Sequence, residues 1–155
     1  MAAATSKLAE RTLTLERVFD APVELLWRCW TEGEHLQRWS CPRGFTIPHA
    51  QGTFTVGGSW RITMRTPEGK DLGVGGEYRE IVPLRRLVMT HAWDDEAGKP
   101  RHWTTVTVTF EALGKRTKVT LVQTGFDSDE SRDGHEGGWS ECLDILAEYL
   151  AKLTA

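Results

Sequence analysis

The residues of this sequence with the greatest capacity for chemistry are its five histidines and seven tryptophans. Histidine titrates near neutral pH, so a buried one can act as an acid, a base or a hydrogen-bonding group. His91 lies in the middle of an expected strand, between Met89 and Trp93, which is an unusual place for a polar ring. Facing inward, it would be the main polar group of a pocket and would need a hydrogen-bond partner. Facing outward, it would be a solvated strand residue, and the pattern leaves both orientations open.

His135 lies one turn before Trp139, near the start of the last apolar helical segment. It could line the mouth of a cavity or tie the start of the helix to a neighbouring loop, and we prefer the structural role. His49 and His102 are expected in loops or at the surface. Trp27 and Trp30 recur at helical spacing, which favours core packing.

Other kinds of site find no support in the sequence. Neither an HExxH motif nor a paired Cys/His spacing is present, so we expect no metal and no other cofactor. There is no GxSxG motif, and Cys29 and Cys142 lie within apolar helix faces, where a thiol is usually inert. We therefore assign no catalytic residue. The glycines at 57–58 and 73–76 fit bends and bulges of a curved sheet better than a phosphate-binding loop.

Composition and charge limit the classes of partner that the protein can bind. The chain is 39% apolar and 26% charged, with a formal net charge of −3. Binding to a nucleic-acid backbone needs clustered Lys and Arg, so we expect no nucleic-acid partner. The three isolated cysteines and the absence of a long apolar run predict a cytoplasmic protein without a membrane span. We expect residues 1–11 to form a disordered tail and residues 12–153 to form one domain.

The pattern of apolar residues predicts a strand, two short helices, about six strands and a long helix. Alternation predicts a strand at Thr12–Phe19, and helical spacing predicts helices from Pro22 to Trp30 and at Gly33–Trp39. Residues 40–52 contain two prolines and two glycines and are predicted to be a loop. Further alternation predicts strands at 59–66, 78–82, 87–93, 103–110 and 117–124, and the last apolar stripe predicts a helix at 130–153.

This order has a structural consequence. An antiparallel sheet with one apolar face must cover that face, and the last helix is the longest element available. A curved sheet that grips one helix leaves a wedge of space between them. An apolar ligand would bind in such a wedge.

Five ordered segments carry a resemblance that runs over residues 12–153. They are FDAPVELLWRCW, GGSWRITMRTPEG, GGEYREIVPLRRLVMT, TVTVTFEALGKRTKVTLVQTGF and HEGGWSECLDILAEYL. The chain resembles the family of activator-of-Hsp90-ATPase homologues, in particular its small stand-alone bacterial members, within the START-like (SRPBCC, helix-grip) superfamily. The resemblance implies an α+β fold: a curved antiparallel sheet wrapped around a long C-terminal helix, two short helices after the first strand, and an apolar cavity between sheet and helix.

The resemblance also places a face of the sheet and the long helix on opposite walls of the cavity. It implies binding of a small hydrophobic or aromatic molecule, such as a lipid, a polyketide or a xenobiotic. We expect the protein to be a monomer or a weak dimer. Two alternatives stay open: a cyclase or hydrolase that uses a cavity histidine, and an interaction module that stimulates a chaperone ATPase. The expected ligand-binding residues are Trp60, Ile62, Met64, Met89, His91, Trp93, Val106 and Val108 on the sheet, and His135, Trp139, Leu143 and Leu146 on the helix.

Overall fold

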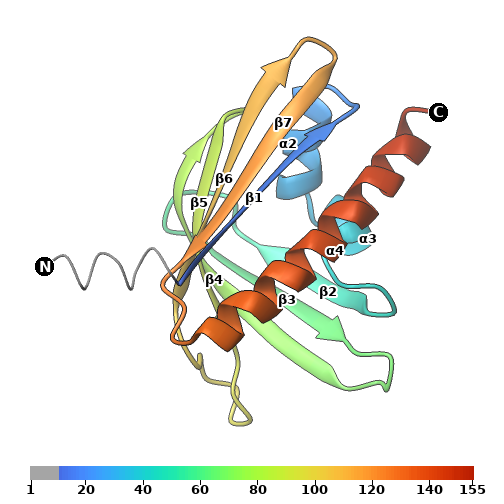
Figure 1. Ribbon diagram of the computed structural model, residues 1–155. Helices are drawn as coiled ribbons and strands as arrows, with labels where there is room; N and C mark the ends of the chain where they lie inside the picture. Colours follow the sequence, from blue (N-terminus) through green and yellow to red (C-terminus); the bar gives the residue numbers. More distant parts are fainter. Residues whose placement is uncertain (1–10) are drawn as a thin grey trace, which may run out of the picture.

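The computed structural model describes residues 11–155, so the expected tail lies outside the described residues, apart from Arg11. A seven-stranded antiparallel sheet has the order β1-β7-β6-β5-β4-β3-β2. The long helix α4 runs diagonally across this strongly bent sheet, and α2 and α3 follow β1 (Figure 1). The elements are β1 (Thr12–Phe19), α2 (Val23–Thr31), α3 (Gly33–Trp39), β2 (Thr46–Gly52), β3 (Ser59–Arg65), β4 (Asp71–Val82), β5 (Arg86–Trp93), β6 (Thr104–Leu113), β7 (Arg116–Thr124) and α4 (Asp129–Leu153).

The expected loop at residues 40–52 is wrong in its second half, where β2 pairs with β3. Pro48 cannot donate to a ladder, but β2 is the edge strand of the sheet, where proline is tolerated. The register also shifts between Thr46 and His49. This irregular, mostly exposed edge has no clean alternation, so its strand character is hidden in the sequence.

Strand β4 begins earlier than the expected 78–82 because its glycines accommodate a neighbouring side chain. Arg61 on β3 lies over Gly73 and Gly75 and forms an ion pair with Asp94, just after β5. A Cβ atom at Gly75 would lie 2.9 Å from Arg61 Cδ, closer than real Cβ contacts allow. On the outer face of the sheet, the Arg61–Asp94 ion pair thus crosses from β3 over β4 to the end of β5. Apolar side chains occupy the opposite face.

Helix α4 begins with a side-chain cap and then presents one apolar stripe to the sheet. Ser128 Oγ accepts a hydrogen bond of 3.0 Å from Ser131 N, which satisfies one of the free N–H groups of the first turn. Leu143 and Leu146 on this helix are almost completely buried, in one cluster with Leu13 of β1 and Leu121 of β7. Burial of such apolar side chains contributes most of the free energy that holds α4 against the sheet.

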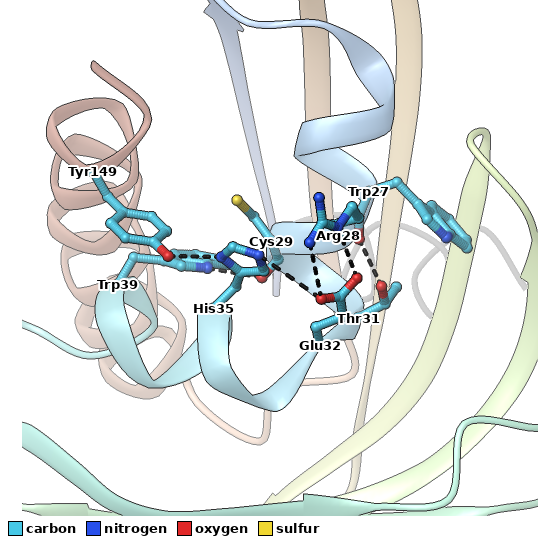
Figure 2. Close-up of polar contacts among 8 residues, drawn as sticks. All are labelled: Trp27, Arg28, Cys29, Thr31, Glu32, His35, Trp39 and Tyr149. Carbon is cyan, nitrogen blue, oxygen red and sulfur yellow. Dashed lines mark hydrogen bonds and ion pairs between the residues drawn. The ribbon is translucent and has the colours of Figure 1, made fainter. Parts of the chain in front are cut away.

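Polar contacts fix the two short helices to each other and to α4 (Figure 2). Trp39 Nε1 donates to Cys29 O at 2.9 Å, which joins α3 to α2. His35 Nδ1 and Tyr149 Oη share a hydrogen bond of 2.6 Å, which joins α3 to α4. These contacts set the position of Trp39, which also lines the cavity described below.

Within residues 11–155, the helices include none that is long and apolar enough to span a membrane.

Candidate functional site

A cavity of about 820 Å³ lies between strands β3–β5, helix α3 and the first half of α4. Most of its lining is apolar or aromatic. The sheet contributes Ala50, Gln51, Gly52, Trp60, Ile62, Met64, Leu72, Val74, Tyr78, Met89, His91, Trp93 and Val106, and the helices and adjoining loops contribute, among others, Trp30, Leu36, Trp39, Phe45, Phe54, His135, Trp139 and Cys142.

The register of the sheet decides which strand residues face the cavity. Trp60 on β3 lies opposite Gly76, and Val74 on β4 lies opposite Trp93 of β5. Alternate residues along β5 share a face, so His91 points the same way as Trp93. His91 is only 8% exposed, and the structure thus places it on the inner face.

Three tryptophans form the helical wall of the cavity. Trp30 of α2 stacks on Trp139 of α4, with ring centroids 6.0 Å apart. Trp39 of α3 meets Trp30 edge to face at 4.5 Å. Trp30 therefore packs in the core, as its helical spacing predicts, and also lines the cavity.

Trp27, by contrast, packs edge to face on Phe110 of β6 with centroids 5.4 Å apart, and it is not part of the cavity wall.

His135 lines the cavity and is hydrogen-bonded to strand β5, not to a neighbouring loop. Its Nε2 lies 2.9 Å from Trp93 Nε1, and its Nδ1 lies 2.7 Å from Ser131 O. An indole N–H can only donate, so Nε2 must accept and Nδ1 must carry the proton that is donated to the carbonyl. The ring is thereby held at the start of α4 against β5 while it lines the cavity.

A buried glutamine that the sequence analysis missed connects the two walls. Gln123 is completely buried on β7, and its Oε1 accepts a hydrogen bond of 2.8 Å from Trp139 Nε1. Its Nε2 donates to Thr104 Oγ1 at 2.8 Å and lies 3.5 Å from His91 Nδ1. Gln123 follows Val119 and Leu121 at every second position of β7, so its side chain faces inward. A polar residue in this inward-facing series is the feature of the sequence that could have identified it.

Burial sets the charge state of the titratable groups in the cavity. It lowers the pKa of His91 to about 3, with the neighbouring His135 ring as a smaller cause, so His91 is neutral at physiological pH. Burial likewise raises the pKa of the Cys142 thiol to about 12. Among the described lining residues, Glu130 is the single carboxylate, and it lies exposed in the first turn of α4.

Val108, Leu143 and Leu146 need a correction, because the structure places them in the core and not on the cavity wall. Leu143 and Leu146 belong to one core cluster with Leu13 of β1, Leu121 of β7 and Val108 of β6. Trp139 and Cys142 of the same helix line the cavity instead. The other nine expected residues all line it: Trp60, Ile62, Met64, Met89, His91, Trp93, Val106, His135 and Trp139.

The part of the chain that the structure describes holds no group of three or more His, Cys, Asp or Glu side chains placed to bind a metal ion.

Comparisons with known proteins agree with this architecture. The family described as Activator of Hsp90 ATPase homolog 1-like protein matches residues 20–151. The comparison with curated proteins found no match. The crystal structure of the AHSA1 protein from Silicibacter pomeroyi is 28% identical, with a TM-score of 0.82 over 90% of this chain and 97% of that one. The solution structure of a protein from Arthrobacter aurescens is 27% identical, with a TM-score of 0.81 over 93% of this chain and 88% of that one.

A more distant structure shares the fold alone. DynU16, a protein in the dynemicin biosynthetic locus, is 18% identical, with a TM-score of 0.73 over 91% of this chain and 47% of that one. The expected helix-grip fold is confirmed by the antiparallel sheet, the long C-terminal helix and these structural neighbours. With the family match over residues 20–151, the chain belongs to the Activator of Hsp90 ATPase homolog 1-like family.

Proposed function

We propose that this protein binds a small hydrophobic or aromatic molecule, such as a lipid, a polyketide or a xenobiotic, in the cavity between the sheet and α4. The observation that carries the proposal is a cavity of about 820 Å³ whose buried lining side chains are apolar, aromatic or neutral. Ligand pockets are typically about 300–1,000 Å³ and are lined mainly by such residues.

The apolar wall can supply the affinity that this function requires. Burial of about 200 Å² of apolar ligand surface contributes about 5 kcal/mol at about 25 cal/mol per Å². The ordering of ligand and side chains reduces this gain. The stacked pair Trp30 and Trp139 offers a flat surface suited to an aromatic ring.

The state of the two cavity histidines favours binding over a cyclase or hydrolase activity. A histidine that acts as a general acid or base needs a pKa near the working pH and a free ring nitrogen. Both nitrogens of His135 are engaged, and burial keeps His91 neutral.

A dye titration with two adjacent variants tests the proposal. Diphenylhexatriene is a neutral hydrocarbon whose fluorescence rises in apolar surroundings. Ile62 lines the cavity, and Thr63 is the next residue of β3, on the opposite face of the sheet. A charge at position 62 must be desolvated against the ligand, so Ile62→Lys should weaken binding by about tenfold or more.

The matched variant Thr63→Lys places the same charge on the outer face and should bind the dye as the unmodified protein does. Equal affinities of the two lysine variants, or no saturable binding by the unmodified protein, would overturn the proposed function.

A further inference from the structure

Hydrogen bonding around Gln123 determines which polar atom the cavity offers to a ligand. Trp139 Nε1–H can only donate, and it lies 2.8 Å from Gln123 Oε1. The orientation of the Gln123 amide is therefore fixed, with its oxygen toward α4. Its NH₂ group must then face Thr104 Oγ1 and His91 Nδ1, at 2.8 and 3.5 Å.

This arrangement selects one tautomer of His91. A donor NH₂ group beside Nδ1 makes Nδ1 the acceptor, so the proton of the neutral ring resides on Nε2. Thr104 Oγ1 cannot alter this, because it accepts from Gln123 and donates to His91 O at 3.2 Å. His91 Nε2–H is thus a hydrogen-bond donor.

No other residue that the structure describes forms a hydrogen bond with this nitrogen. The His91 side chain is more than nine-tenths buried and lines the cavity. A ligand that covers this donor without accepting from it leaves a buried polar group unpaired, which costs free energy. A ligand atom that accepts a hydrogen bond would remove this cost.

Two other ring nitrogens near the cavity are also unpaired, but their atoms are closed off from it. Trp30 Nε1 and Trp60 Nε1 are buried and find no partner within the described part of the chain. The ring of Trp60 lies beside His91, with centroids 5.9 Å apart. His91 Nε2–H is therefore the donor on which the ligand chemistry depends.

We propose that the ligand is a neutral, largely apolar molecule with an acceptor oxygen, such as a ketone carbonyl, that His91 Nε2–H binds. This inference rests on the proposed function and adds the chemical class of the ligand. A neutral acceptor fits better than an anion, because the buried lining holds no cation and an unpaired buried charge is costly. A pure hydrocarbon would leave the donor unpaired.

Fluorene and fluorenone form a matched pair of probes, since they have nearly the same shape and fluorenone adds one carbonyl group. Their affinities can be measured by displacement of diphenylhexatriene, for the unmodified protein and for His91→Phe. The variant keeps a flat ring and removes the N–H. The ratio of the fluorenone affinity to the fluorene affinity should fall about tenfold in His91→Phe, whatever the change in the affinity for fluorene.

Two further measurements keep the test independent of how well that variant folds. In the unmodified protein, the carbonyl stretching band of bound fluorenone should shift to a lower wavenumber than in a non-hydrogen-bonding solvent. In His91→Gln, whose side-chain amide can donate from a similar position, part of the fluorenone preference should return.

The outcomes separate the two proposals. If both probes bind but the preference is the same in His91→Phe and the carbonyl band is unshifted, the acceptor inference is overturned and the proposed function stands. If neither probe nor the dye binds, the proposed function fails and the inference falls with it.

Discussion

Trp139 of α4 and Gln123 of β7 are joined by a hydrogen bond of 2.8 Å that links the long helix to the buried face of the sheet. The bond lies beside the cavity, because Trp139 lines it and Gln123 also contacts His91. Gln123 thus positions Trp139 on the helical wall of the cavity and His91 on the sheet wall.

Replacement of Gln123 by leucine should destabilise the protein. The change leaves Trp139 Nε1 and Thr104 Oγ1 without their partner, and an unsatisfied buried group costs about 1–3 kcal/mol. Urea denaturation measures the loss. Gln51→Leu, at an exposed position of β2, is the control and should leave the midpoint nearly unchanged. Equal midpoints for the two variants would contradict the role given to Gln123.

Acid should destabilise the protein in part through His91. The pKa of His91 is near 6.5 in an unfolded chain and about 3 in the folded protein, because burial disfavours the charged ring. Between these values the unfolded chain binds more protons, so stability falls as the pH is lowered. From about pH 7 to about pH 4.5 this amounts to about 2 kcal/mol.

Urea midpoints at both pH values, compared between the unmodified protein and His91→Gln, isolate this contribution from that of the other groups. The variant should lose less stability on acidification, and parallel losses in the two proteins would count against a buried neutral His91.

Core and cavity residues of the apolar interior should respond differently to truncation. Leu143 is 1% exposed within the core, so Leu143→Ala should cost roughly 2–5 kcal/mol of stability and leave the affinity for diphenylhexatriene unchanged. Ile62 lines the cavity and is only partly buried, so Ile62→Ala should cost less stability and weaken binding of the dye. A weaker dye affinity in folded Leu143→Ala would show that Leu143 lines the cavity and would contradict its place in the core.

The thiols should be unreactive while the protein is folded. Burial raises the pKa of Cys29 to about 11 and that of Cys142 to about 12, and Cys41 is also buried. Only the thiolate reacts with iodoacetamide, so labelling should be slow in native buffer and complete in denaturant. Mass spectrometry follows both reactions, and rapid native labelling of Cys142 would show that its side of the cavity is open to solvent.

Much of the fold could be predicted from the sequence where local signals agree with tertiary packing. The bounds expected for Thr12–Phe19 and Gly33–Trp39 are those observed, because clear periodicity there ends at strong boundary residues. β2 could not be predicted, since an edge strand with Pro48 and little burial has no alternating pattern.

The candidate site was predictable in part. The alternation of β3 correctly places Trp60, Ile62 and Met64 on one face. The face of His91 depends on a register that runs through the glycines of β4, which have no side chains to indicate it.

The helix residues show a different limit of the sequence. The apolar stripe of α4 is uniform, and whether it meets a packed core or a cavity depends on the bend of the sheet. Local spacing therefore could not separate Leu143 and Leu146 from Trp139.

The most direct test of the central claim is a heteronuclear NMR titration of the indole N–H signals with diphenylhexatriene. Trp30, Trp39, Trp60, Trp93 and Trp139 line the cavity, whereas Trp103 is 51% exposed and does not. An aromatic ligand in the cavity shifts the signals of nearby protons. Binding in the cavity should give saturable shifts for the five lining tryptophans and leave the Trp103 signal unchanged. Unchanged lining signals at saturating dye, or shifts confined to Trp103, would contradict binding in this cavity.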